Sequence, residues 1–202
     1  METGLSAEDR KRIEQSVRQK YARVSESPDR FFTYPTGRAG LEALKYDSEM
    51  IQSLPEAVIS SYCGVGNPFS LGPIREGEAI LDIGCGGGVD TLIAAMMVGP
   101  TGRVVGIDTV PEMLERAERN LQGTTFENVM FQEVSSEALP FPDEGFDVVI
   151  SNGVFNLIPD KGRALRETIR VLKPNGRLMI ADQVLTGELQ EDPKKRIESW
   201  FR

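Results

Sequence analysis

Residues 80–90 read ILDIGCGGGVD, an apolar run that passes directly into four glycines. The apolar half predicts a buried β-strand, and the glycines predict a turn that can adopt positive φ and bring bare backbone close to a ligand. A helical pattern follows, and the start of a helix offers unpaired N–H groups to an anion. The stretch therefore predicts a nucleotide-like ligand at the end of a central strand.

The sequence after this stretch predicts a sheet with crossover helices. The expected strands are residues 78–84, 103–108, 128–134, 146–152 and 177–182, the last of which follows a turn at 173–176. The expected helices are residues 89–99, 111–123 and 160–172, with Asp160 as the cap of the third. Buried strands joined by helices predict an α/β fold with a doubly wound, mainly parallel sheet, which binds ligands beyond the carboxyl ends of its strands.

Residues 1–70 are expected to form an N-terminal helical extension or lid, and residues 71–202 the α/β domain. In residues 7–26 one helical face carries Ile13, Val17, Tyr21 and Val24. Residues 27–40 are turn-rich and aromatic, which predicts a linker or lid rather than a regular element. Residues 48–68 predict two short helices that are separated near Pro55.

Composition limits the class of protein. The 202 residues, 40% of them hydrophobic, suffice for one ordinary core, and two cysteines are too few for a disulfide framework. No stretch resembles a signal peptide or reaches the roughly 18 apolar residues of a membrane span. We expect a cytoplasmic protein with no membrane partner.

Charge and the absence of histidine exclude further classes. The net charge is −8, and the excess of acid lies in residues 46–202, so binding of nucleic acid through charge is disfavoured. The chain has no histidine, the commonest general base near neutral pH and the commonest metal ligand. We expect no metal site, and any chemistry must proceed without imidazole.

Asp108 is the expected partner of the glycine loop. It lies twenty residues after Gly88 and ends the second expected strand, where a carboxylate can accept hydrogen bonds from both hydroxyls of a ribose. The dinucleotide fingerprint of dehydrogenases would need a small residue at position 89, which is Val89. A dehydrogenase is therefore disfavoured.

Five motifs in order carry a family resemblance: the run from Asp82 through Gly88, Asp108, "PEML" at 111–114, "ALPFPDEGFDVVISN" at 138–152 and "RVLKPNGRLMIAD" at 170–182. Over roughly residues 60–182 the chain resembles class I S-adenosylmethionine-dependent methyltransferases. The resemblance implies a Rossmann-like fold, S-adenosylmethionine as cofactor and methyl transfer to a small-molecule acceptor. A cofactor-binding protein without turnover remains the alternative.

The resemblance also implies a set of cofactor-binding residues: Asp82, Gly84, Gly86, Gly88, Asp108, Thr109, Met113, Ser135, Ser136, Asn152 and Gly153. The glycines would form the floor under the methionine part, and Asp108 would hold the ribose. Met113 would pack on the adenine or belong to the core, and Asn152 and Gly153 would border the methyl group. Asp82 would support the loop rather than touch the cofactor. Ser135 stands where the family often has an acidic residue, and no residue is assigned as catalytic.

Two stretches narrow the resemblance to the branch of arsenite methyltransferases and quinone-ring C-methyltransferases: "GVGNP" at 64–68 and "SNGVFNLIPDK" at 151–161. Arsenite enzymes carry a cysteine in each stretch, where this chain has Val65 and Gly153, with only Cys63 nearby. Because one thiol cannot replace a three-thiolate site, arsenic methylation is disfavoured, and a homologue that has lost its arsenic-binding cysteines stays an alternative.

Asn156 would orient an acceptor or cap its loop, and the aromatic residues of "FFTYPTG" at 31–37 would line the acceptor pocket or pin the lid.

The related fold continues after the fifth strand with a helix and an antiparallel hairpin, whereas only twenty residues follow Asp182. We therefore expect the hairpin to be missing and a homo-oligomer to bury Trp200 and Phe201 at the uncovered edge. A shortened chain, a natural stop and a codon read as selenocysteine are all consistent with this end.

Overall fold

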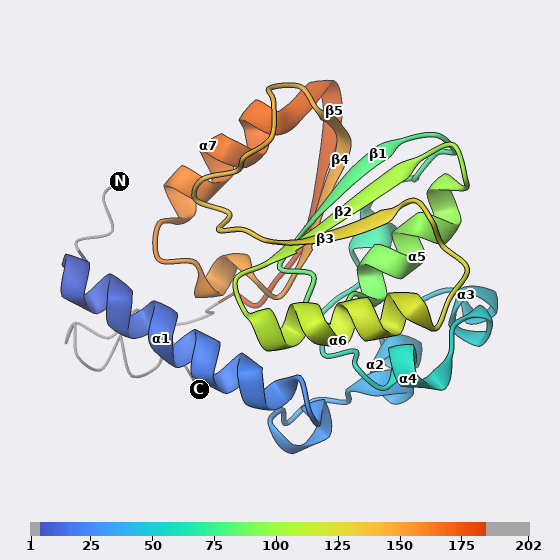
Figure 1. The fold of residues 1–202 in the computed structure, drawn as a ribbon, viewed down its shortest axis with the longest axis horizontal. Helices are drawn as coiled ribbons and strands as arrows, with labels where there is room; N and C mark the ends of the chain where they lie inside the picture. Colours follow the sequence, from blue (N-terminus) through green and yellow to red (C-terminus); the bar gives the residue numbers. More distant parts are fainter. Residues whose placement is uncertain (1–4, 185–202) are drawn as a thin grey trace.

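The computed structural model of the protein describes residues 5–184, which fold around one five-stranded sheet (Figure 1). The strands are β1 (Ala79–Ile83), β2 (Arg103–Asp108), β3 (Val129–Glu133), β4 (Phe146–Asn152) and β5 (Leu172–Ala181). All neighbours pair in parallel, in the order β3-β2-β1-β4-β5. The predicted α/β fold with a parallel sheet is confirmed.

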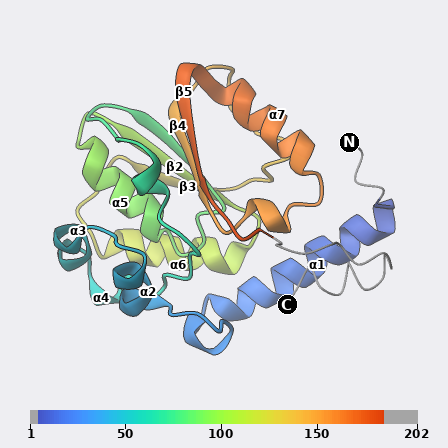
Figure 2. The same ribbon diagram turned by 180° about the vertical axis from the view of Figure 1, so that it is seen from behind.

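Helices cover both faces of the sheet, as Figures 1 and 2 show from opposite sides. The crossover helices are α5 (Val89–Val98), α6 (Pro111–Gln122) and α7 (Lys161–Val171). Ile80 of β1 packs in a cluster with α5, while its neighbour Leu81 packs in a cluster with α7. Side chains alternate between the faces of a strand, so β1 must be apolar in both directions. This explains the uninterrupted apolar run from residue 79 to 81.

The N-terminal extension is helical, with α1 (Ala7–Val24), α2 (Gly37–Ala43), α3 (Ser48–Ser53), α4 (Glu56–Ile59) and the 3-10 turns Pro28–Arg30 and Pro68–Leu71. Ser6 and Asp9 form a reciprocal capping box at the start of α1. The apolar face of α1 is as predicted, with Ile13 and Val24 fully buried. Figure 1 shows α1 running along the molecule beside α6.

One part of the extension differs from the sequence expectation. The predicted linker 27–40 contains the Pro28–Arg30 turn and the first residues of α2. Helix α2 forms despite two glycines because Leu41 is fully buried in a cluster with Ile51 and Ile59, and such burial outweighs the low helix propensity of glycine. The same cluster includes Leu92 and Ile93 of α5, so the extension shares a core with the sheet.

The start of β5 also differs. The expected turn at 173–176 lies within the strand, which begins at Leu172. Asn175 has a positive φ of 63°, and the register of β4 with β5 shifts between Phe146 and Val148, which marks a bulge. The predicted burial of Trp200 and Phe201 lies outside the described residues, as does any hairpin beyond residue 184. Within residues 5–184, no helix is both long and apolar enough to span a membrane.

Candidate functional site

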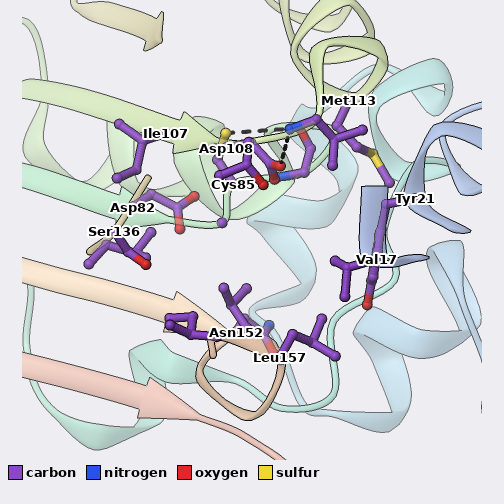
Figure 3. A pocket seen from close by; sticks show the side chains of 18 of the residues that line it. Val17, Tyr21, Asp82, Cys85, Ile107, Asp108, Met113, Ser136, Asn152 and Leu157 are labelled. Carbon is purple, nitrogen blue, oxygen red and sulfur yellow. Dashed lines mark hydrogen bonds between the residues drawn. The ribbon is translucent and has the colours of Figure 1, made fainter. Parts of the chain in front are cut away.

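A cavity of about 680 Å³ lies where the strands of the sheet end. Its lining comes from α1, the segment 61–65, the glycine loop, the ends of β2 and β4, and the loops 133–137 and 152–159. In Figure 3, Val17 and Tyr21 of α1 lie on the opposite side of the cavity from Asp82 and Ser136. The volume is within the range of about 300–1,000 Å³ that is usual for cofactor and small-molecule sites.

The glycine loop is held by the next strand. The backbone N–H groups of Gly84 and Cys85 both donate to the carbonyl of Ile107, at 2.8 and 2.9 Å. Gly88 has φ +81°, and a Cβ there would come within 2.8 Å of Phe131, so glycine is needed for both conformation and space. Apart from the two chain neighbours of Gly86, the nearest described atom to a Cβ built there is the sulfur of Met113, at 4.0 Å. Gly86 therefore presents open backbone to the cavity.

Asp108 connects the end of β2 to the glycine loop. Its Oδ2 accepts from the N–H of Gly86 at 2.9 Å, and its Oδ1 accepts from the N–H of Val110 at 3.0 Å. Each carboxylate oxygen can accept two hydrogen bonds, so both retain capacity for a ligand. Burial raises the pKa of Asp108, although the backbone hydrogen bonds oppose this shift. The predicted ribose-binding residue thus lies half-buried in the wall of the cavity.

Asp82 lies beneath the loop, with a partner that the sequence did not indicate. Its Oδ2 accepts from the hydroxyl of Thr91 at 2.6 Å, so the support runs to α5 rather than to N–H groups of the loop. Asp82 is 2% exposed, and burial, reinforced by Asp90, raises its pKa to about 8. At neutral pH this carboxyl is largely protonated.

Four further residues predicted to bind the cofactor lie along the cavity, namely Thr109, Met113, Ser135 and Ser136. Met113 also belongs to the core, since it packs with Val24 and Val110, and its packing on the adenine stays a prediction. Thr109 and Ser135 are exposed and Ser136 is buried. Cys85 is buried and packs against Ala117 and Phe131.

Asn152 and Gly153 also line the cavity, at the end of β4. The side chain of Asn152, however, is occupied by the protein: its Oδ1 accepts from the N–H groups of Val65 and Gly66 at 2.9 and 3.1 Å. Asn156 is absent from the lining; its N–H donates to Asp182, and its buried Oδ1 finds no hydrogen-bond partner among residues 5–184. The structure therefore brings Asn152 to the cavity and leaves Asn156 behind it.

Sequence reasoning missed Asp90 and the buried tyrosines next to it. Asp90 is 8% exposed, lines the cavity and accepts from the Tyr46 hydroxyl at 2.8 Å. Burial raises the pKa of Asp90 to about 6, against the opposing effect of its hydrogen bonds. An acidic residue in the first turn of a helix is common for reasons of the helix dipole, so the sequence alone gave no reason to single it out.

The extension closes one side of the cavity, as the lid prediction required. Val17 and Tyr21 of α1 reach into it, and Tyr34 joins them, with its hydroxyl donating to the carbonyl of Cys63 at 3.1 Å. Phe31 and Phe32 instead pack under the end of α1. The aromatic segment thus contributes one side chain to the cavity and two to the packing of α1, and its contact with an acceptor stays a prediction. Burial raises the pKa of the Cys63 thiol to about 12, so it remains protonated.

Comparisons with known proteins identify the relatives of this chain. Residues 74–202 match the family model described as a methyltransferase domain. The arsenite methyltransferase of Halobacterium salinarum is 41% identical over 157 residues, which are 78% of this chain and 40% of that protein. A ubiquinone/menaquinone biosynthesis C-methyltransferase, UbiE, of an Enterobacter species is 42% identical over 111 residues, 54% of this chain and 44% of that protein. The chain spans less than half the length of these two relatives.

Solved structures agree. The arsenic(III) S-adenosylmethionine methyltransferase of Chlamydomonas reinhardtii superposes with a TM-score of 0.56 at 35% identity, covering 74% of this chain and 50% of that one. An S-adenosylmethionine-dependent methyltransferase of Aquifex aeolicus gives 0.56 at 25% identity, covering 75% and 81%. The chain belongs to the methyltransferase domain family, and its predicted resemblance to S-adenosylmethionine-dependent methyltransferases is confirmed.

Proposed function

We propose that this chain binds S-adenosylmethionine in the cavity and transfers its methyl group to a small-molecule acceptor. The observation that carries the proposal is the meeting of the Asp108 carboxylate and the open backbone of Gly86 at one end of a cavity whose other side is built by α1. Because the chain spans less than half of the curated relatives compared above, the activity is proposed from this site and not transferred from them.

The residues present fit the cofactor. The bare backbone at Gly86 leaves room for the methionine part beside the loop, since, apart from its two chain neighbours, the nearest described atom to a Cβ built there is the Met113 sulfur at 4.0 Å. The Asp108 oxygens each keep capacity for a ribose hydroxyl. Met113 offers an apolar surface to the adenine.

Bound S-adenosylmethionine supplies a methyl group that is already activated for displacement, so the chain must mainly orient two ligands and exclude water. The side chains of Val17 and Tyr21 cover the cavity and would exclude water from the acceptor side. The Cys63 thiol, which also lines the cavity, stays protonated. We infer that positioning, rather than a strong base, serves the transfer.

The test is incubation with methyl-labelled S-adenosylmethionine and separate acceptors: a phenol, a quinol, a thiol, an amine and arsenite. We expect S-adenosylhomocysteine and a labelled product with an organic acceptor. Cofactor binding without S-adenosylhomocysteine formation from any acceptor would instead support a binding protein without turnover.

Arsenite is the acceptor that the relatives' names suggest and that the lining residues disfavour. A Cβ built on Gly153 lies 3.3 Å from the Val65 methyl groups, so the two residues are neighbours in the cavity wall. Valine and glycine offer no ligand for a soft metalloid, and the two thiols that line the cavity, Cys63 and Cys85, are fewer than a three-thiolate site needs. We propose a homologue of the arsenite enzymes that acts on another acceptor.

Cytoplasmic location and self-association belong to the same proposal. The two free cysteines, Cys63 and Cys85, support a reducing compartment. The exposed Met130 on the edge strand β3 supports a contact between copies. Light scattering at micromolar concentration tests the second point, and a monomer mass would contradict it.

A further inference from the structure

A buried set of polar side chains, the Asn152 clamp, joins three distant parts of the chain beside the cavity. Its members are Tyr46, Tyr62, Asp90 and Asn152. Tyr46 and Tyr62 come from the N-terminal extension, Asp90 from the first turn of α5 and Asn152 from the end of β4. The first three are at most 8% exposed, so their hydrogen bonds are formed away from bulk water.

Asn152 has no hydrogen-bonding capacity left for a ligand. A carboxamide has two N–H donors and two acceptor lone pairs. Its Oδ1 accepts from the backbone of Val65 and Gly66, and the shortest contacts of its Nδ2 are to the carbonyl of Gly66 at 2.8 Å and to Asp90 Oδ2 at 2.9 Å. All four positions are therefore filled by the protein. The opposite amide orientation would set N–H groups against N–H groups, so this orientation is fixed.

The other members complete the set. The Tyr46 hydroxyl lies 2.8 Å from Asp90 Oδ1, and the Tyr62 hydroxyl lies 2.9 Å from the Gly66 carbonyl, each in a geometry for donation. The two rings meet edge to face with centroids 5.4 Å apart. Asp90 thus accepts on both oxygens, and the Gly66 carbonyl accepts from Asn152 as well as from Tyr62.

The clamp acts on the wall of the cavity through Val65. Asn152 holds the peptide groups of Val65 and Gly66, and the Val65 side chain lies over Gly153, at 3.3 Å from a Cβ built there. Both Val65 and Gly153 line the cavity, as do Val17 and Tyr21 of α1 and Tyr34. Because the backbone of this loop is fixed, the Val65 side chain has one position in the cavity wall. An acceptor that binds there must fit the wall in that shape.

We propose that Asn152 is a positioning residue: through the clamp it fixes Val65 over the end of β4, and so sets the shape of the acceptor side, rather than contacting the cofactor itself. This inference rests on the proposed function in one respect, namely that the cavity holds S-adenosylmethionine and an acceptor. The hold on the loop can be measured without turnover.

The experiment is amide hydrogen exchange by NMR on wild type, Asn152→Ala, Tyr46→Phe and the matched control Asn128→Ala. Asn128 is a matched control because its side-chain amide also donates to two backbone carbonyls, those of Gly99 and Gly102. Asn128 does not line the cavity. We expect exchange at Val65 and Gly66 to rise more than tenfold in Asn152→Ala and at least threefold in Tyr46→Phe. The control should stay within twofold. Exchange at Leu81 and Val149 should hardly change, which separates release of the loop from general loss of stability.

Coupling and ligand binding supply the second readout. Because both residues act on one loop, Tyr46→Phe should have little further effect in the Asn152→Ala background. Should Asn152→Ala fail to fold, Tyr46→Phe can replace it, because this variant removes only one hydroxyl outside the cavity. Exchange at Val65 and Gly66 in Tyr46→Phe then tests the proposal. Unchanged exchange at Val65 and Gly66 in a folded variant overturns the proposal. A tenfold loss of S-adenosylhomocysteine affinity in Asn152→Ala without a change in that exchange also overturns it, because Asn152 would then touch the cofactor. Absence of ligand binding by wild type would refute the proposed function and leave the exchange result standing.

Discussion

At the scale of single residues, the carboxylate of Asp108 has two roles. It accepts hydrogen bonds from the Gly86 and Val110 amides, and it lines the cavity. We expect Asp108→Ala to weaken S-adenosylmethionine binding by about 1.5–3 kcal/mol, the usual contribution of a charge-assisted hydrogen bond. Calorimetric titration measures this, with far-ultraviolet circular dichroism to verify the fold. Asp143→Asn, an exposed carboxylate paired with Arg170, is the control. Equal affinities in folded Asp108→Ala and wild type would remove Asp108 from the binding site.

Asp82 gives a pH dependence of stability with a definite sign. Its pKa rises from an ordinary 3.8 to about 8 in the folded chain. Between these values the folded state binds more protons than the unfolded state, so the free energy of unfolding falls as pH rises from about 4 to 8. Asp82→Asn cannot titrate, and its amide oxygen can still accept from Thr91. Between pH 5.5 and 8 the free energy of unfolding should fall in both proteins. We expect the fall to be smaller in the variant than in wild type by at least about 1 kcal/mol, since one pKa unit corresponds to about 1.4 kcal/mol.

Urea denaturation at several pH values measures the effect of Asp82→Asn. Asp90 shares the sign of the shift and remains in the variant, so part of the decline should persist. Parallel stability curves for variant and wild type would show that Asp82 does not titrate in this range.

At the scale of elements, the start of α5 depends on Gly88. Alanine there would need a left-handed conformation, which disfavours non-glycine residues by about 1–2 kcal/mol, and its Cβ would meet Phe131 at 2.8 Å. We expect Gly88→Ala to lower the free energy of unfolding by at least 2 kcal/mol in urea denaturation. Adding Phe131→Leu should recover only part of this loss, because it relieves the contact and leaves the strained φ. A fully stable Gly88→Ala would contradict this account of the loop.

Helix α1 is held to the rest by a small number of buried side chains. Ile13 is fully buried, and truncation of a buried isoleucine to alanine usually destabilises by about 2–5 kcal/mol. We expect Ile13→Ala to lower the free energy of opening α1 by about 2–4 kcal/mol, seen as faster amide exchange in α1. The exposed Gln19→Ala is the matched control. If both variants exchange alike, α1 is not anchored through Ile13.

Most elements could be predicted because their signals are local. Asp160 does cap α7, accepting from the N–H of Arg163, and Pro111 does stand in the first turn of α6. Helix α2 and the early start of β5 could not, since both depend on distant partners: Leu41 is buried by other segments, and Leu172 pairs with Phe146. Local propensity contains no information about such burial.

At the scale of the whole molecule, parallel pairing gathers residues that the sequence separates widely. Asp108 and Asn152 end their strands and Asp82 is the last residue but one of its strand, so the position of each in the cavity follows from neighbouring strand ends meeting at one edge. The hydrogen bonds of Asn152 are different. They reach Tyr46, 106 positions away, and Val65, 87 positions away, and no periodic pattern marks either partner. The convergence of these residues on one cavity could therefore be predicted, whereas the hydrogen bonds that tie Asn152 to the extension required coordinates.

The central claim is that the cavity beside the glycine loop takes S-adenosylmethionine. Its most direct test is calorimetric titration of the wild-type chain with S-adenosylmethionine, S-adenosylhomocysteine and NAD in parallel. The account predicts saturable binding of the first two, with one site per chain, and no detectable heat from NAD, because Val89 replaces the small residue that a dinucleotide site needs. Binding of NAD, or no binding of S-adenosylmethionine and S-adenosylhomocysteine by the folded chain, would contradict it.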